Sequence, residues 1–182
     1  MCEAYHKLRR DTDFSGVTLE AAGYLAPEHR GYLQGIEQQM KKWDLGDEFR
    51  YRGVLDRVHK IDFLRSLSVL SVPGPYAEPK GIYALEAMAN AVPVVQPRHG
   101  VFPEMIEKTG GGILVEPGNV DSLAEGIYSL WRDQARAEEL GRLGAEGVRR
   151  HYGAAQMAER AVQVYGEVGV SGGRPTPRVT GA

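Results

Sequence analysis

Short apolar runs alternate with longer amphipathic stretches through most of the chain. The short runs are rich in Val, Leu and Ile, and two of them end at a glycine, as strands do. In the longer stretches apolar residues recur every three or four positions, which is the period of a helix with one packed face. We expect strands at 17–22, 49–52, 69–72, 93–96 and 112–115, separated by helices at 28–43, 56–64, 84–90 and 102–108.

The two ends of the chain depart from this alternation. Residues 2–10 carry a helical pattern with no strand in front of it, so we expect the chain to be a piece cut from a longer protein. Beyond Gly118 the pattern is wholly helical, and the last residues are rich in Gly and Pro with no period. We expect a helix capped by Asp121, helices at 135–152 and 154–168, and a disordered tail at 169–182.

Repeated strand–helix units with short connections predict an α/β fold. We expect a Rossmann-like parallel sheet with helices on both faces and a helical C-terminal end. A length of 182 residues favours a single domain, placed at 1–168. Ligands of such sheets bind beyond the carboxyl ends of the strands, so the loops that follow strands are where a site is expected.

Composition and charge narrow the classes of function. The formal net charge is −2 and the Lys and Arg residues are scattered, which argues against a nucleic-acid partner. No apolar run is long enough to span a membrane, and no segment resembles a secretory signal. The single Cys2 excludes an intramolecular disulfide and fits a cytoplasmic location. The His residues lack metal-ligand spacing, so we expect neither a metal site nor a cofactor.

The segment Glu78-Pro-Lys-Gly-Ile-Tyr-Ala-Leu-Glu86 is the strongest candidate for chemistry. It joins an expected strand to an expected helix, and such a turn presents backbone N–H groups and a positive dipole end to a phosphate. Its two carboxylates would repel phosphate but accept hydrogen bonds from sugar hydroxyls. Glu86 stands among apolar and small residues, where an unpaired carboxylate is costly and a ribose diol can be its partner. The segment therefore predicts a site for a nucleotide sugar.

These residues also resemble a known family. Glu78-x7-Glu86, with Gly81 between and Glu-Ala-Met-Ala at the end, resembles the signature of the retaining glycosyltransferases of family four (group 1). Further blocks resemble the elements that follow in that family, at 93–95, 112–119 and 121–127. The resemblance covers about residues 17–160. It implies the C-terminal, donor-binding half of the two-domain GT-B fold.

The resemblance implies roles for the first half of the motif. Glu78 would contact hydroxyls of the transferred sugar, and it is the catalytic candidate as a positioning and charge-stabilising residue. Lys80 and Gly81 would present backbone groups to the same sugar. The family usually has an aromatic residue where this chain has Lys80, so the Lys80 side chain is either a contact to the donor or a solvent-facing cation.

The rest of the donor would be bound further along the motif and by one other loop. The resemblance implies that Ile82 and Tyr83 give N–H groups to the diphosphate and that Glu86 holds the ribose hydroxyls. The loop after the strand at 49–52 would let Val54 and Leu55 read the nucleotide base through backbone groups. A plain strand-ending turn is the alternative for that loop.

The front of the chain departs from the family pattern. The family's C-terminal domain usually opens with a strand, then Gly-Arg and Lys-Gly, whose side chains clamp the diphosphate. This chain starts after that point, and we expect Lys7, Arg9 and Arg10 to be surface residues. The resemblance thus implies that two phosphate ligands and the whole N-terminal acceptor-binding domain are missing here. It also implies that the chain alone does not transfer sugar, and that any membrane contact is made through the missing half.

The resemblance implies transfer of a sugar from a UDP-, GDP- or ADP-sugar to an acceptor, with retention of configuration and without a metal. Two alternatives stay open. An epimerase could use the same architecture, but it needs an acid/base pair around one sugar carbon, and no such pair is evident. The other alternative is a non-catalytic module that binds nucleotide sugars.

Overall fold

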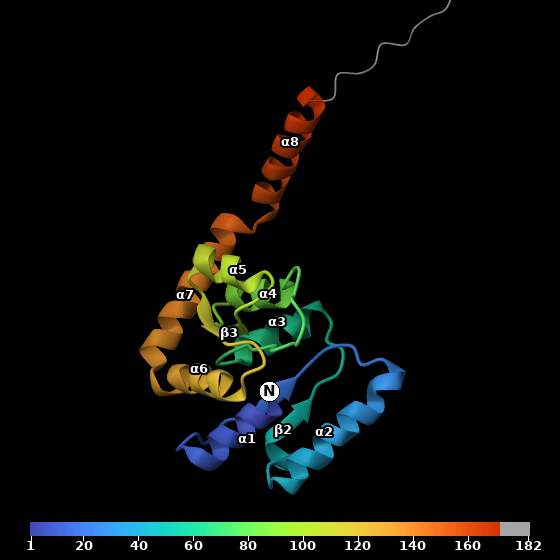
Figure 1. The fold of residues 1–182 in the computed structure, drawn as a ribbon, viewed down its shortest axis with the longest axis vertical. Coiled ribbons are helices and arrows are strands. Elements are labelled where there is room, and N and C mark those ends of the chain that lie inside the picture. The colour runs from blue at the N-terminus through green and yellow to red at the C-terminus, as the bar shows by residue number, and fades with distance from the viewer. Residues whose placement is uncertain (172–182) are drawn as a thin grey trace, which may run out of the picture.

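The computed structural model describes residues 1–171, with side chains through Val168, and its strands form two parallel ladders (Figure 1). β1 (Leu19–Ala21) pairs with β2 (Phe49–Tyr51), and β3 (Val94–Pro97) pairs with β4 (Gly112–Val115). Both ladders are parallel, as the repeated strand–helix units predict. The carboxyl ends of paired strands therefore lie at the same edge.

The prediction of a strand at 69–72 is wrong, because this segment makes only a single bridge. The two ladders therefore do not join into one regular sheet. Leu70 alone makes a parallel bridge, to Val94 on β3. The N–H of Val72 donates instead to the side-chain Oε1 of Gln96, at 3.3 Å. Because a side chain takes the place of a backbone acceptor there, the segment leaves the ladder after one bridge.

Helices connect the strands, and every helix expected from the pattern forms. In chain order the helical elements are α1 (Cys2–Asp11), η1 (Pro27–His29), α2 (Arg30–Lys42), η2 (Gly46–Glu48), α3 (Arg57–Ser66), α4 (Ile82–Ala89), α5 (Phe102–Thr109), α6 (Val120–Arg132), α7 (Gln134–His151) and α8 (Ala154–Ser171). Of the disordered tail expected at 169–182, residues 169–171 belong to α8, and residues 172–182 lie outside the described part of the chain.

Two helix starts test the capping predictions. Asp56 caps α3 as expected, because its carboxylate accepts a backbone N–H at 2.9 Å. α6 is capped by Asn119 rather than by Asp121, since the Asn119 Oδ1 accepts the N–H of Ser122 at 2.9 Å. Asp121 falls inside the first turn of α6, where its carboxylate pairs with Lys7 at 3.2 Å.

β3 separates two hydrophobic clusters. Val94 packs with α3, α4 and α5 through Leu64, Met88, Phe102 and Met105. Val95 packs with α1 and α6 through Tyr5, Leu8, Leu123 and Ile127. Neighbouring residues of a strand point to opposite faces, so helices cover both faces of the β3–β4 ladder, as expected.

Arg9 is not the surface residue that was expected. Its guanidinium makes a bidentate ion pair with Glu48, with contacts of 2.8 and 2.9 Å, and also donates to the Phe14 carbonyl at 2.6 Å. The pair forms because η2 brings Glu48 beside α1, which no local pattern indicates. Lys7 and Arg10 have side chains that are 39% and 62% exposed, in line with the prediction.

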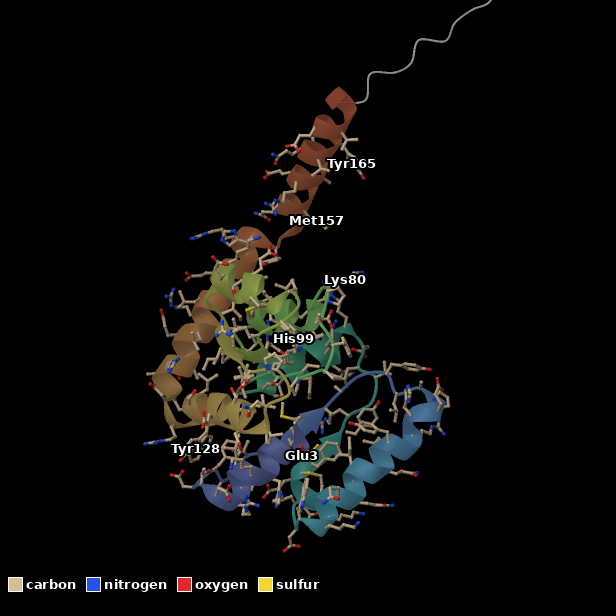
Figure 2. The ribbon with its side chains drawn as sticks, in the orientation of Figure 1. Glu3, Lys80, His99, Tyr128, Met157 and Tyr165 are labelled. Atoms are coloured by element: carbon tan, nitrogen blue, oxygen red, sulfur yellow. The ribbon has the colours of Figure 1, made fainter. Side chains whose placement is uncertain are left out.

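The last helix, α8, projects away from the rest of the molecule (Figure 1). Large apolar side chains on it are exposed, among them Met157 at 72% and Tyr165 at 77% (Figure 2). Within residues 1–171, no helix is long and apolar enough to cross a membrane.

Candidate functional site

The loop that carries Glu78 ends on Gly81, the N-cap of α4. Gly81 has a φ of 59° and a ψ of 33°, in the left-handed region that favours glycine. It is buried, and a Cβ there would lie 3.0 Å from the Met105 side chain and 3.1 Å from the Phe102 ring. The turn and the close packing of the loop on α5 therefore both require glycine.

A second glycine holds the same loop from another element. Gly100, in the connection from β3 to α5, has a φ of 59°, and a Cβ there would lie 2.4 Å from the carbonyl oxygen of Glu78. The neighbouring Val101 N–H donates to that carbonyl at 2.9 Å. The backbone at Glu78 is thus pinned by a different strand–helix unit. The motif spacing does not indicate this contact, and its only sequence signal is a glycine after a strand.

The carboxylate of Glu78 accepts hydrogen bonds within its own loop. Its Oε1 accepts the backbone N–H groups of Gly81 and Lys80, each at 3.0 Å. These bonds hold the pKa of Glu78 below its usual value, so the side chain is ionised at neutral pH. The N–H groups expected to face a sugar are therefore occupied by Glu78. The Lys80 side chain is exposed to solvent (Figure 2).

Ile82 and Tyr83 begin α4 and leave two N–H groups free. The first N–H groups of a helix have no intrahelical acceptor, and none of the described residues provides one here. The Tyr83 ring is half-buried, with its centroid 6.3 Å from that of Phe102. Burial, and then the negative charge of Glu78, raise the pKa of Tyr83 to about 12. The hydroxyl of Tyr83 is therefore protonated at neutral pH.

Glu86 has a protein partner that the sequence does not reveal. The Nζ of Lys60, on α3, lies 2.5 Å from the Glu86 Oε1. The two side chains are 43% and 37% exposed, so the pair lies at the surface. Glu86 is therefore not the lone acid that its neighbours in the sequence indicate, because α3 packs against α4 and brings a cation to it. The second carboxylate oxygen makes no hydrogen bond within the described residues.

The Lys60–Glu86 pair lines a concavity of about 520 Å³ between α3 and α4. Leu55 contributes to its wall, as suits a residue proposed to lie beside a base. Val54, the other residue expected there, is 71% exposed and does not line the concavity. The remaining lining includes Arg57, Ile61 and Asn90.

One further side chain contacts the loop that precedes Glu78. The Nε2 of His99 lies 3.3 Å from the Gly74 carbonyl, which favours the tautomer that donates from Nε2. His99 therefore helps to hold the start of this loop. Elsewhere, no group of three or more His, Cys, Asp or Glu residues in the described part of the chain could hold a metal ion.

Comparison with known proteins identifies the family. The profile of the group 1 glycosyl transferases matches residues 1–147. The chain belongs to the group 1 glycosyltransferases. One relative in this group, the phosphatidyl-myo-inositol mannosyltransferase of Mycobacterium leprae, is 32% identical over 143 residues, which make up 78% of this chain and 38% of that protein. The chain spans less than half the length of the curated glycosyltransferases it matches.

Solved structures show which half of a group 1 glycosyltransferase this is. The C-terminal domain of the group 1 protein LpcC from Francisella tularensis matches with a TM-score of 0.72 and 25% identity, over 84% of this chain and 77% of that one. HepE from Anabaena, solved with UDP, matches with a TM-score of 0.80 over 91% of this chain and 44% of that one. At 17% identity, HepE shows the fold alone. The chain is the C-terminal half of a GT-B fold, as expected.

Proposed function

We propose that this chain binds the nucleotide-sugar donor of a retaining glycosyltransferase. The observation that carries the proposal is the order of groups along α4. The ionised Glu78 lies in front of the helix, the free N–H groups of Ile82 and Tyr83 lie at its start, and Glu86 follows about one turn later. Free N–H groups at a helix start suit a diphosphate, and carboxylates suit hydroxyls. A nucleotide sugar presents sugar, diphosphate and ribose in the same order.

Glu78 is the proposed contact to the transferred sugar. One of its oxygens accepts from Lys80 and Gly81, and the proposed role of the other is to accept hydrogen bonds from sugar hydroxyls. Its negative charge would stabilise the positive charge that develops on the sugar as the diphosphate leaves. The start of α4 would stabilise the negative charge on the leaving group. Glu78 thus acts by position and charge, and no step in this proposal requires a metal.

The proposed donor is a UDP-, GDP- or ADP-sugar. HepE, which shares the fold, was solved with UDP, and the M. leprae relative is a mannosyltransferase. The UDP of HepE supports a nucleoside diphosphate as the carrier, and the mannosyltransferase supports a hexose as the transferred sugar. Leu55 remains the proposed contact to the base, and Val54 could take part only through its backbone.

The acceptor is proposed to be held by a second half of the enzyme. This is supported by the length of the relatives, since the match covers only 38% of the M. leprae protein. The exposed apolar side chains of α8 also support it, because they are suited to contact a partner. We therefore expect the chain alone not to transfer sugar. Membrane contact, if the acceptor is a lipid, would fall to that half. The cytoplasmic location rests on the single Cys2 and stays a prediction.

Titration of the chain with UDP-glucose, GDP-mannose and ADP-glucose tests the proposal. We expect at least one of them to bind, and Glu86→Gln to weaken that binding about tenfold, because a hydrogen bond to a charged acceptor becomes one to a neutral acceptor. Glu107→Gln, an exposed carboxylate on α5, is the matched control and should bind as the wild type does. Failure of all three donors to bind at millimolar concentration would refute the proposed function. Unchanged binding by Glu86→Gln would refute only the ribose assignment.

A further inference from the structure

We propose that Lys60, with Arg57 beside it, selects a donor whose base carries keto oxygens, namely uracil or guanine. This inference rests on the proposed function, because it concerns the same site. Lys60 and Glu86 both line the concavity between α3 and α4. The Nζ of Lys60 lies there within hydrogen-bond distance of the Glu86 carboxylate, which is proposed to bind the ribose.

The place of the base follows from the covalent structure of the donor. If Glu86 holds the ribose hydroxyls, the base is one glycosidic bond away. The Lys60 Nζ is 2.5 Å from Glu86, so its remaining N–H groups border the volume that the base enters. Leu55 and Ile61 line the same concavity and offer apolar surface to the faces of the ring.

The side chains that remain free in this concavity are donors. The ammonium of Lys60 and the guanidinium of Arg57 donate and cannot accept. Arg57 makes no hydrogen bond or ion pair within the described residues, so its donors are free. Asn90 already makes one hydrogen bond with each polar atom of its amide, because its Oδ1 accepts from Arg65 at 3.1 Å and its Nδ2 donates to the Glu86 carbonyl at 2.9 Å. Glu86 itself is shared between Lys60 and, in the proposal, the ribose.

A donor-only wall distinguishes the bases by the edges that they present. Uracil offers its carbonyl oxygens, and guanine offers O6 and N7 together, all of which accept hydrogen bonds. Adenine and cytosine place an amino group, itself a donor, at the corresponding position. An amino group facing Lys60 would lose its hydrogen bond to water without replacement. The chemistry of the wall therefore favours uracil and guanine.

A different role for Lys60 makes a different prediction. If Lys60 only balances the charge of Glu86, or attracts phosphate at a distance, its loss weakens all nucleotides by the same factor. Base selection instead requires that its loss weaken UDP or GDP more than ADP. The ratio of affinities, rather than any single affinity, is the quantity to measure.

Dissociation constants for UDP, GDP and ADP, measured by ligand-detected NMR titration, test this inference. For the wild type we expect UDP or GDP to bind about tenfold tighter than ADP, the size of one hydrogen bond to a charged group. Lys60→Met should bring this ratio to within about twofold. Lys60→Arg, which keeps a donor-only cation, should preserve it. Lys42→Met, which removes an exposed cation at the end of α2, should also preserve it.

The outcomes separate this inference from the proposed function. Binding of none of the three nucleotides by the wild type would overturn the proposed function, and this inference with it. Binding with an unchanged ratio in Lys60→Met would overturn base selection alone, as would tightest binding of ADP by the wild type. Thermal unfolding of Lys60→Met should occur close to the wild-type temperature, because the pair is exposed.

Discussion

Substitution of Gly100 by alanine should both destabilise the fold and displace the loop that carries Glu78. A Cβ at this position would lie 2.4 Å from the Glu78 carbonyl oxygen, 2.6 Å from its nitrogen and 3.0 Å from the Ala77 carbonyl carbon. All three atoms belong to the backbone, so no side-chain rotation relieves the contact. The loop must move away, and the Val101 N–H then loses its acceptor on Glu78.

The magnitude has two parts. A non-glycine residue at a φ of 59° costs about 1–2 kcal/mol, and forced overpacking costs about 1–3 kcal/mol more. Gly16→Ala is the matched control, because Gly16 has a φ of 68° but nothing lies within 4 Å of its Cβ position. Replacing glycine by alanine lowers the entropy of the unfolded chain by the same amount in both variants, so this effect cancels in the comparison. We therefore expect Gly100→Ala to be less stable than Gly16→Ala by about 1–3 kcal/mol.

Urea denaturation followed by circular dichroism measures this difference, and titration with the best-binding nucleotide sugar measures the effect on the site. Gly100→Ala should bind that donor several-fold more weakly, whereas Gly16→Ala should bind it as the wild type does. Equal losses of stability in the two variants would refute the close contact between Gly100 and Glu78. A Gly100→Ala protein that is destabilised but binds normally would refute the role of the contact in positioning Glu78.

Other predictions test single contacts. Hydrogen bonds lower the pKa of Glu78 in the fold, so its contribution to stability is complete above pH 4.5 and is lost as the pH falls through the lowered pKa. The stability difference between wild type and Glu78→Gln, followed by thermal unfolding, should therefore shrink only below pH 4.5, and a difference that vanishes at higher pH would contradict this. Arg9→Met should lower the free energy of unfolding, measured in urea, by about 1–2 kcal/mol, because Glu48 and a backbone carbonyl lose a half-buried partner. An unchanged free energy of unfolding would show that water replaces the ion pair without cost. Asn119→Ala should cost about 1 kcal/mol as a lost helix cap, and Asp121→Ala clearly less; the reverse order would restore Asp121 as the cap.

Much of the fold and part of the site could be predicted from local patterns. The helices, four of the five expected strands and the Asp56 cap depend on residues close together in the chain, and these appear where the pattern places them. The motif from Glu78 to Glu86 is equally local. Its turn at Gly81 and its free N–H groups are consequences of one loop running into one helix.

The errors have a common origin in contacts between distant segments. Arg9 was expected at the surface, and the packing of η2 against α1 gave it Glu48. The strand at 69–72 was expected to be complete, and the Gln96 side chain took the N–H of Val72. In each case a group from another element supplied a hydrogen-bond partner that the local pattern does not show.

The sequence by itself determined the α/β class and the order of the elements, because both follow from periodicity and turn chemistry within short segments. The resemblance of the Glu78–Glu86 motif and the blocks after it indicated the family and the residues of the proposed donor motif. Only the tertiary structure placed Lys60 beside Glu86 and Gly100 against Glu78. These contacts depend on how α3 packs on α4 and how the loop after β3 approaches the motif. Packing brings together side chains that no interval in the sequence relates, so the concavity and its cation could be found only in three dimensions.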